Sequence, residues 1–289
     1  MKRLAFFVGS DITSWLICHD VVSRIHSLAK VMIFFPKHSV ITKSTCKELT
    51  SLAAYERTVL TEVIFPLLNN LQEIPGSYGT PALLCKNTCV HNVVVEDIND
   101  VAFSLFIREN FDGVISLRCY QKFSSSYVDH FRDSYILWNL HPGELPLYRG
   151  VMTCFRAMQN GETEHAFTLH QMDAGWDSGD IIAKGFVPLD LQRSFLGNML
   201  SLYPSGVALL VDNLTRYLGG EALHLTPQVA GRYWRFPNQE ELLSSLRKGL
   251  MLVNHEEARE WYRRLFFSDA SPRQSQAFSD AFDSHVLTT

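Results

Sequence analysis

The sequence predicts an α/β fold, a doubly wound, mostly parallel sheet, and two observations carry this prediction. Short apolar runs alternate with stretches of helical periodicity over residues 1–220, an order typical of helices packed on both faces of a sheet. The apolar runs are continuous rather than alternating, as expected of strands that are covered on both faces. The opening shows the pattern: a strand at 4–8, a helix at 15–29 and a strand at 31–35, which Pro36 stops.

The later elements are expected in the same alternation, although residues 37–90 are less clear. One helix or two could lie within 49–71, and Pro75–Gly76 with Gly79–Thr80–Pro81 indicates a loop. The remaining expected elements are strands at 92–95, 114–117, 135–140, 167–172 and 181–187, and helices at 98–110, 127–131, 151–160 and 196–218.

The chain divides into one α/β domain over 1–220, a small C-terminal helical appendage over 221–267 and a tail over 268–289. The appendage is expected to hold two short helices, because Asn238 and Asn254 each resemble an N-cap with a glutamate three residues on. The tail is rich in Ser, Asp, Ala and Gln, and we expect it to be disordered.

Composition excludes several function classes. Of the 289 residues, 46% are hydrophobic and 19% are charged, which is typical of a folded globular protein. The net charge of −4 gives no electrostatic reason to expect a nucleic-acid surface. No run approaches the roughly 20 consecutive apolar residues of a membrane helix, and the run after Lys2 and Arg3 is too short for a signal peptide. We therefore expect a cytoplasmic protein with no membrane or nucleic-acid partner.

The common cofactor and metal motifs are missing. No G-x-G-x-x-G or Walker A loop occurs, and Gly9–Ser10–Asp11 after the first strand supplies one glycine only. Cys85, Cys89 and His91 form the only tight cluster of metal-ligand types, but with three residues between the cysteines and no second pair. We expect no metal there.

Two polar side chains stand at the end of the strand expected over 135–140. Asn139 and His141 are two residues apart, which places both on one face, and Pro142 ends the strand. They would lie at the carboxyl edge of the sheet, where open α/β sheets bind ligands. The alternative is that they only satisfy backbone groups of the loop.

A second polar cluster runs from Asp173 to Asp180, with three acidic residues and two glycines. It fits an ordinary turn, and it lacks the spacing and closing glutamate of an EF-hand. Its functional interpretation is a tight loop that presents a carboxylate and backbone amides to a ligand.

Together these segments resemble the folate-dependent formyltransferase family, which includes the glycinamide ribonucleotide, methionyl-tRNA and amino-sugar formyltransferases and a formyltetrahydrofolate hydrolase. The resemblance rests on Asn139-x-His141-Pro142, Leu145-Pro146, Arg149-Gly150 and Asp173-x-Gly175-x-Asp177-x-Gly179, with Asp177 placed 36 residues after His141. It extends back through residues 112–116 and 120–123 and forward to about Asp190, while residues 37–90 and those after 220 match loosely.

The resemblance implies a Rossmann-like fold, an enzyme, and Asn139, His141 and Asp177 as its catalytic residues. The chemistry agrees, because an amide N–H can stabilise the oxyanion of formyl transfer and an imidazole can gain and lose a proton near neutral pH. Asp177 would orient and charge-stabilise the imidazole. The donor implied is N10-formyltetrahydrofolate, without a metal, and the residues implied to bind it are Ser116, Tyr120, Gln121, Lys122, Phe123, Asp173, Ala174, Gly175 and Trp176.

The acceptor is less constrained. A transfer-RNA substrate would need a basic surface and, in the family, a further C-terminal domain. A glycinamide ribonucleotide substrate would need a phosphate loop after the first strand, where Asp11 would repel a phosphate. We therefore expect a small-molecule amine in a biosynthetic pathway: a nucleotide-linked amino sugar, or an amino-acid-type, N-hydroxy or aminooxy metabolite.

The same motifs are compatible with two functions besides amine formylation. The chain could be a formyltetrahydrofolate hydrolase, or a non-catalytic member of the fold that only binds folate or a partner protein. The aromatic and basic stretch Gly231–Pro237 could stack on a base or sugar, or pin the C-terminal helices to the domain. A homodimer is compatible with each of these functions.

Overall fold

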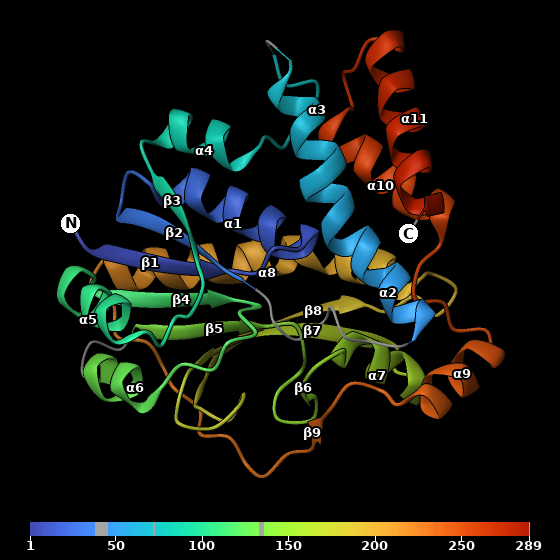
Figure 1. The fold of residues 1–289 in the computed structure, drawn as a ribbon. Helices are drawn as coiled ribbons and strands as arrows, with labels where there is room; N and C mark the ends of the chain where they lie inside the picture. The colour runs from blue at the N-terminus through green and yellow to red at the C-terminus, as the bar shows by residue number, and fades with distance from the viewer. Residues whose placement is uncertain (38–45, 72, 133–135, 289) are drawn as a thin grey trace.

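A computed structural model describes residues 1–37, 46–71, 73–132 and 136–288. Its centre is a seven-stranded sheet of order β3-β2-β1-β4-β5-β7-β8 (Figure 1). The strands are β1 (Arg3–Val8), β2 (Lys30–Pro36), β3 (His91–Val95), β4 (Gly113–Leu117), β5 (Leu137–His141), β7 (Glu164–Gln171) and β8 (Ile181–Pro188). This arrangement confirms the α/β prediction with a mostly parallel sheet.

Strand pairing brings the polar end of β5 between two neighbours. The first five strands of the sheet order pair in parallel, and β5 and β7 pair antiparallel, as do β7 and β8. Asn139 is in register with Ser116 of β4 on one side and with His170 of β7 on the other. The side chains of three strands therefore meet at one place on the sheet edge.

Two cores form on the two faces of the sheet because successive strand residues point to opposite sides. In β1, Phe6 faces the larger core and Phe7 the smaller. The larger core is covered by α1 (Ile12–Ile25), α7 (Thr153–Asn160) and α8 (Phe195–Leu218), among others, and the smaller by α5 (Val101–Asn110) and α6 (Ser125–Phe131). Helices on both faces explain why the strands read as continuous apolar runs.

Helix α8 is long and apolar enough to cross a membrane by length and composition, with a mean hydropathy of 1.2. Within the fold, however, 56% of that window is buried, and α8 packs against α1, β7 and β8. Its apolar face is therefore used by the core.

The unclear region before β3 contains a continuous helical run. It consists of α2 (Lys47–Ala53), the π-helical segment η2 (Ala54–Ile64) and α3 (Phe65–Asn69), and α4 (Pro81–Thr88) follows the Pro- and Gly-containing loop. π-Helical turns occur frequently at functional sites, and η2 contributes Glu56 to the cavity described below and packs against α11 (Pro272–Thr288).

The C-terminal part adds a two-residue strand, β9 (Tyr233–Trp234), which pairs with β6 (Arg149–Gly150), and the helices α9 (Gln239–Arg247), α10 (His255–Phe266) and α11 (Pro272–Thr288). The N-caps predicted at Asn238 and Asn254 are present, since both side chains accept hydrogen bonds from the backbone three residues on. The predicted boundaries at 220 and 267 are not marked by separate cores, because the large core continues into these helices.

The expectation of a disordered tail over 268–289 is wrong for the part that the structure describes, residues 268–288. Residues 272–288 form α11, which packs on η2 and α10 beside the upper end of the long helical run in Figure 1. Its anchors are Phe278 and Phe282, which are 1% and 0% exposed. They lie four residues apart on one helix face, and their burial outweighs the polar composition on which the expectation rested.

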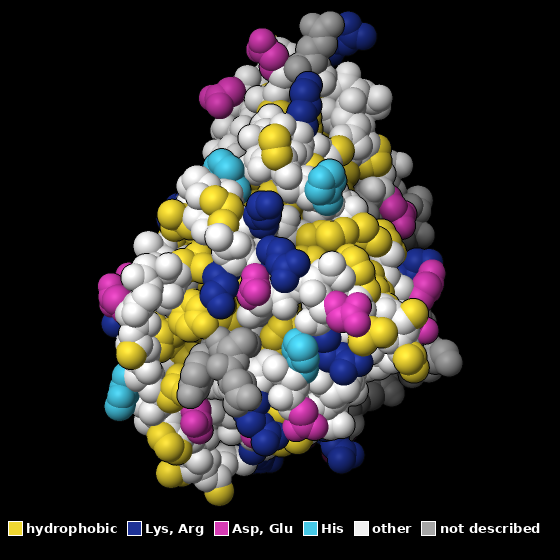
Figure 2. All heavy atoms as spheres, turned by 90° about the vertical axis from the view of Figure 1, so that its left-hand side faces the viewer, with side chains coloured by type: hydrophobic (Ala, Val, Ile, Leu, Met, Phe, Trp, Pro, Cys, Tyr) yellow, Lys and Arg dark blue, Asp and Glu magenta, His cyan; other side chains and the backbone are white. Residues whose placement is uncertain are grey.

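The face opposite to these helices mixes charge and apolar surface. Figure 2 shows basic and acidic side chains interspersed with exposed hydrophobic ones. The edge strand β3 and helix α5 expose five large apolar side chains: Val93, Val94, Val101, Leu105 and Phe106. A homodimer remains a prediction.

Candidate functional site

A cavity of about 900 Å³ opens at the carboxyl end of β4 and β5. Asn139, His141 and Asp177 all line it. Its volume is near the upper end of the range for small-molecule sites, roughly 300–1,000 Å³. The edge of the sheet predicted to bind a ligand therefore carries a cavity with room for more than a small metabolite.

The ring of His141 is fixed by a backbone group. It is 3% exposed, and its Nε2 lies 2.7 Å from the carbonyl oxygen of Tyr148. Because a carbonyl oxygen can only accept, Nε2 carries a proton and donates it. In the neutral imidazole, Nδ1 is then the nitrogen with the free lone pair, and it faces Oδ1 of Asp177 at 3.5 Å.

Asp177 is held by the backbone of β6. Its Oδ2 accepts a hydrogen bond of 2.9 Å from the amide of Gly150, while Oδ1 points to His141 and lies 3.8 Å from Nε2 of His170. Asp177 has a φ of 52°, a left-handed conformation that costs free energy outside glycine. The tight loop over 173–180 thus presents this carboxylate to the imidazole, as the resemblance implied.

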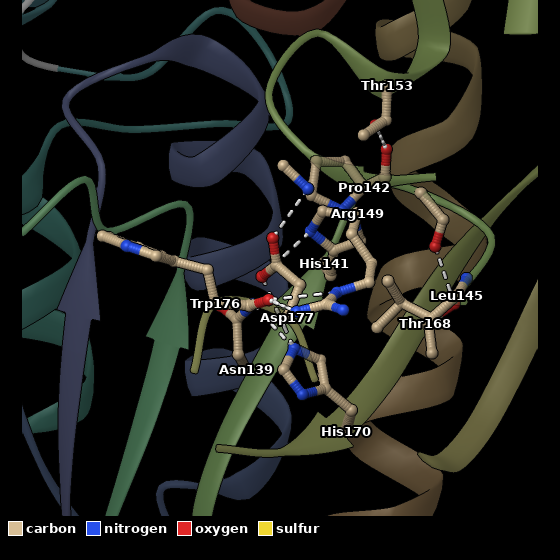
Figure 3. A network of polar contacts seen from close by, with 12 residues as sticks. Asn139, His141, Pro142, Leu145, Arg149, Thr153, Thr168, His170, Trp176 and Asp177 are labelled. Atoms are coloured by element: carbon tan, nitrogen blue, oxygen red, sulfur yellow. Dashed lines mark hydrogen bonds and ion pairs between the residues drawn. The ribbon is translucent and has the colours of Figure 1, made fainter. Parts of the chain in front are cut away.

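His170 is a site residue that the sequence reasoning missed. It is 1% exposed, and burial lowers the pKa of its imidazole to about 4, against the opposing effect of the Asp177 charge. Its Nδ1 donates to the carbonyl of Gln171 at 2.9 Å, which leaves Nε2 to accept from Nδ2 of Asn139 at 3.1 Å. His170 therefore orients the amide of Asn139 (Figure 3). The pairing depends on the antiparallel register of β5 and β7, which the sequence does not reveal.

The loop between His141 and β6 is pinned from several sides. Thr168 donates to the carbonyl of Gly143 at 2.7 Å and accepts from the amide of Leu145 at 3.2 Å. Thr153 donates to the carbonyl of Pro142, which also lies 3.1 Å from Nε2 of His165. These contacts, several of which are drawn in Figure 3, fix the first part of the loop that leads to Tyr148, whose carbonyl bonds His141.

Most of the residues predicted to bind the donor line the cavity. Ser116, Tyr120, Lys122, Phe123, Asp173, Gly175 and Trp176 do so. Ala174 and Gln121 are not part of the lining. The Gln121 amide bonds three backbone groups instead: it accepts from Ile98 and donates to the carbonyls of Lys37 and Glu96. The structure therefore gives the Gln121 side chain a structural role and does not support the predicted one.

Backbone strain concentrates at this cavity. Among the described non-glycine residues, four have positive φ, and three of them, Arg118, Met152 and Asp177, line the cavity. Such conformations persist only where the surrounding structure enforces them, and they cluster at functional sites.

A buried charge network, also missed from the sequence, forms another part of the wall. Arg118 donates to Asp11 at 2.7 Å and to Glu56 at 3.2 Å. Burial alone would raise the pKa of Asp11, but Arg118 and two hydrogen bonds from Ser14 hold it below its usual value. Burial raises the pKa of Glu56, and Arg118 only partly opposes this. These residues lie on separate elements, so no local motif could have indicated them.

The segment 231–237, for which the sequence left two functions open, both packs on the domain and reaches the cavity. Trp234 stacks on Tyr148 and lies under the guanidinium of Arg232 at 3.6 Å, which pins the segment to the domain. Tyr233 and Arg235, its sequence neighbours, line the cavity. Within the described residues, no group of three or more His, Cys, Asp or Glu side chains is suited to hold a metal ion.

A family model described as formyl transferase matches residues 104–195, the segment that contains the three residues of the site. A methionyl-tRNA formyltransferase from Chlamydia abortus is 31% identical over 176 residues, which are 60% of this chain and 53% of that protein. One from Ralstonia pickettii is 38% identical over 92 residues, 32% of this chain and 28% of that protein. The chain thus matches about half or less of the length of these relatives.

Solved structures show the same fold at low identity. An N-formyltransferase from Helicobacter canadensis, in complex with folinic acid and dTDP-3-aminofucose, has a TM-score of 0.52 at 17% identity, covering 81% of this chain and 71% of its own. A phosphoribosylglycinamide formyltransferase from Anaplasma phagocytophilum has a TM-score of 0.54 at 12% identity, covering 81% of this chain and 99% of its own. The resemblance predicted from the motifs is confirmed.

Proposed function

We propose that the protein transfers the formyl group of N10-formyltetrahydrofolate to the nitrogen of a small-molecule amine, because residues 104–195 match the formyl transferase family model. The proposal places this step in a cytoplasmic biosynthetic pathway. The observation that carries it is the convergence of Asn139, His141 and Asp177 on one cavity, with Nδ1 of His141 facing the Asp177 carboxylate at 3.5 Å.

The proton chemistry follows from the tautomer of His141. The carbonyl of Tyr148 keeps the proton on Nε2, so Nδ1 accepts the proton that the attacking amine loses. Asp177 stabilises the imidazolium that forms. When the bond from the formyl carbon to N10 breaks, the same imidazolium returns the proton to the folate nitrogen. One residue thus serves both halves of the transfer.

Asn139 stabilises the negative charge that develops during the transfer. Attack on the formyl carbon converts its oxygen into an oxyanion, which fixed N–H donors stabilise. The Asn139 amide has two N–H groups, and His170 accepts one of them. The second remains for the oxyanion, and because the amide is already oriented, little reorganisation is needed in the transition state.

The proposed donor fits the rest of the lining. Tyr120, Phe123 and Trp176 offer aromatic surface to a pterin. Lys122 is exposed at the cavity, where its charge would attract the carboxylates of the folate glutamate. A related fold holds folinic acid in its own complex, which supports a folate in this position.

The decisive experiment incubates the protein with N10-formyltetrahydrofolate and a panel of amines, and follows the gain of one formyl group by mass spectrometry. The panel contains amino acids, aminooxy compounds, nucleotide-linked amino sugars, glycinamide ribonucleotide and initiator methionyl-tRNA. We expect a formylated small molecule, no product with His141→Ala, and equal folinic acid binding by both proteins.

Two results would overturn the proposal. Formate and tetrahydrofolate appearing without any amine would make the protein a hydrolase. Folinic acid binding with no turnover of any kind, by wild type as well as by His141→Ala, would make it a folate-binding protein without catalysis.

A further inference from the structure

The part of the cavity wall that the predicted donor residues do not account for is mainly apolar. Helix α2 contributes Leu49, Leu52 and Ala53, and the first turns of α8 contribute Phe195 and Met199. Leu49 and Ala53 are one turn apart, as are Phe195 and Met199, so each helix presents one face to the cavity. Such a wall favours apolar carbon over phosphates or sugar hydroxyls, whose desolvation it would not repay.

Glu56 is the acidic residue in this wall, and it lies beside Arg118, which also lines the cavity. It lies on η2 four residues after Leu52 and is 5% exposed. Its Oε1 accepts from Arg118 at 3.2 Å, whereas Oε2 makes no hydrogen bond within the described ranges. Because Glu56 lines the cavity, a ligand N–H or O–H group there can donate to this second carboxylate oxygen.

The N-terminus of α1, behind this wall, is not a free phosphate site. Arg118 links Glu56 to Asp11, which caps the N-terminus of α1. Helix N-termini are common phosphate sites, but here the position is filled: Asp11 is 0% exposed and accepts from the amide and the hydroxyl of Ser14. This helix end therefore offers no free amides to a ligand phosphate.

We propose that Leu49, Leu52, Ala53, Glu56, Phe195 and Met199 form an acceptor subsite for a primary amine on an apolar carbon body without a phosphate group. Glu56 accepts a hydrogen bond from an N–H or O–H group of this acceptor. The inference rests on the proposed function, because formyl transfer is what requires an acceptor beside His141. Between the acceptors left open above, it selects an apolar amino-acid-type amine over a nucleotide-linked amino sugar.

The test compares L-leucine amide and L-methionine amide with dTDP-3-aminofucose and glycinamide ribonucleotide. Binding is measured by calorimetry with the protein saturated with folinic acid, and formylation with N10-formyltetrahydrofolate. We expect the two apolar amides to bind and to be formylated with a kcat/KM at least about 10-fold above the phosphate-bearing amines, a ratio that a few buried methylenes suffice to give.

Substitutions in the subsite test where the acceptor amine binds. Leu49→Trp fills the subsite and should raise KM for the amide at least about 10-fold, with the affinity for folinic acid unchanged. Ser51→Trp is the matched control, because Ser51 is exposed on the same helix and does not line the cavity. Glu56→Gln should raise KM more than it lowers kcat. Leu49→Trp keeps the test independent of the buried Glu56–Arg118 pair, which also supports the fold.

The outcomes separate the two proposals. Amide binding that Leu49→Trp abolishes, with no formylated product from any amine, would leave the subsite standing and contradict the proposed function. Preferred formylation of a phosphate-bearing amine, or a wild-type KM in Leu49→Trp, would overturn the subsite and leave formyl transfer standing.

Discussion

The contact between Asn139 and His170 makes a specific prediction about catalysis. His170 donates through Nδ1 to the backbone and accepts through Nε2 from Asn139 at 3.1 Å. In this account His170 never touches the reacting atoms. It is a positioning residue, whose whole effect on the rate passes through the amide that stabilises the oxyanion.

The substitution His170→Phe keeps a ring of similar shape and removes the acceptor. The contact is one neutral hydrogen bond, which contributes about 0.5–1.5 kcal/mol net, so kcat should fall about 2- to 12-fold. Asn139→Ala removes the oxyanion donor itself and should cost about 100- to 1,000-fold. His170→Gln restores an acceptor oxygen and should recover part of the loss. Because the Gln171 carbonyl also loses its donor in His170→Phe, rates are compared at a temperature well below the measured Tm of each variant.

A double-mutant cycle decides whether His170 acts through Asn139. The kcat at saturating N10-formyltetrahydrofolate is measured for wild type, both single variants and the double variant. We expect the double variant to match Asn139→Ala, since no oriented amide is left to lose. The positioning role would be refuted if the fall in kcat of the double variant equalled the product of the falls in the two single variants. It would also be refuted if His170→Phe bound folinic acid more weakly than wild type.

Four further predictions follow from the structure. Asp177→Asn keeps the size of the side chain but removes the charge that stabilises the imidazolium. We therefore expect kcat to fall about 100-fold or more with little change in Tm. An unchanged kcat would show that the charge is not needed. In Gly143→Ala the new Cβ would lie 2.6 Å from Nε2 of His141 and would displace the ring. We expect kcat to fall about 10- to 100-fold while the affinity for folinic acid stays constant. A wild-type kcat would mean that the position of the ring is not critical. Burial lowers the pKa of both His165 and His170 to about 4, below the unfolded value of roughly 6.5, so the unfolded chain binds more protons than the folded protein between these two pH values. The free energy of unfolding should therefore be highest above pH 6.5 and fall towards pH 4, by on the order of 3 kcal/mol per histidine. Equal free energies of unfolding in urea at pH 7 and pH 5 would contradict this. Phe282→Ala should lower the free energy of unfolding, measured by urea titration, by about 3–5 kcal/mol. An unchanged free energy of unfolding would show that the packing of α11 does not stabilise the fold.

The sequence was most informative where chemistry and local geometry coincide. The two-residue spacing of Asn139 and His141, followed by Pro142, places both side chains at the carboxyl edge of the sheet, and the structure has them there. The separation of Asp177 from this pair is bridged by the hairpin of β7 and β8, whose apolar runs were visible. Local periodicity and turn residues therefore sufficed to outline the site.

The residues that escaped prediction depend on contacts distant in sequence. Glu56 reaches the cavity only because η2 crosses towards β4, where Arg118 lies 62 residues further along the chain. His170 reads as an ordinary strand residue until the register with Asn139 is known. The prediction of a disordered tail was wrong for a related reason. Phe278 and Phe282 pack against residues distant in sequence, and the composition of the tail does not indicate these contacts.

The central claim is that a formyl group passes from folate to an amine and that His141, held by Tyr148 and facing Asp177, moves the proton that this transfer requires. The most direct measurement is the molar ratio of formylated amine to tetrahydrofolate produced, in wild type and in His141→Ala. We predict a ratio of one for wild type, and neither product from His141→Ala although it binds folinic acid normally. Tetrahydrofolate without formylated amine, or wild-type turnover by His141→Ala, would contradict the account.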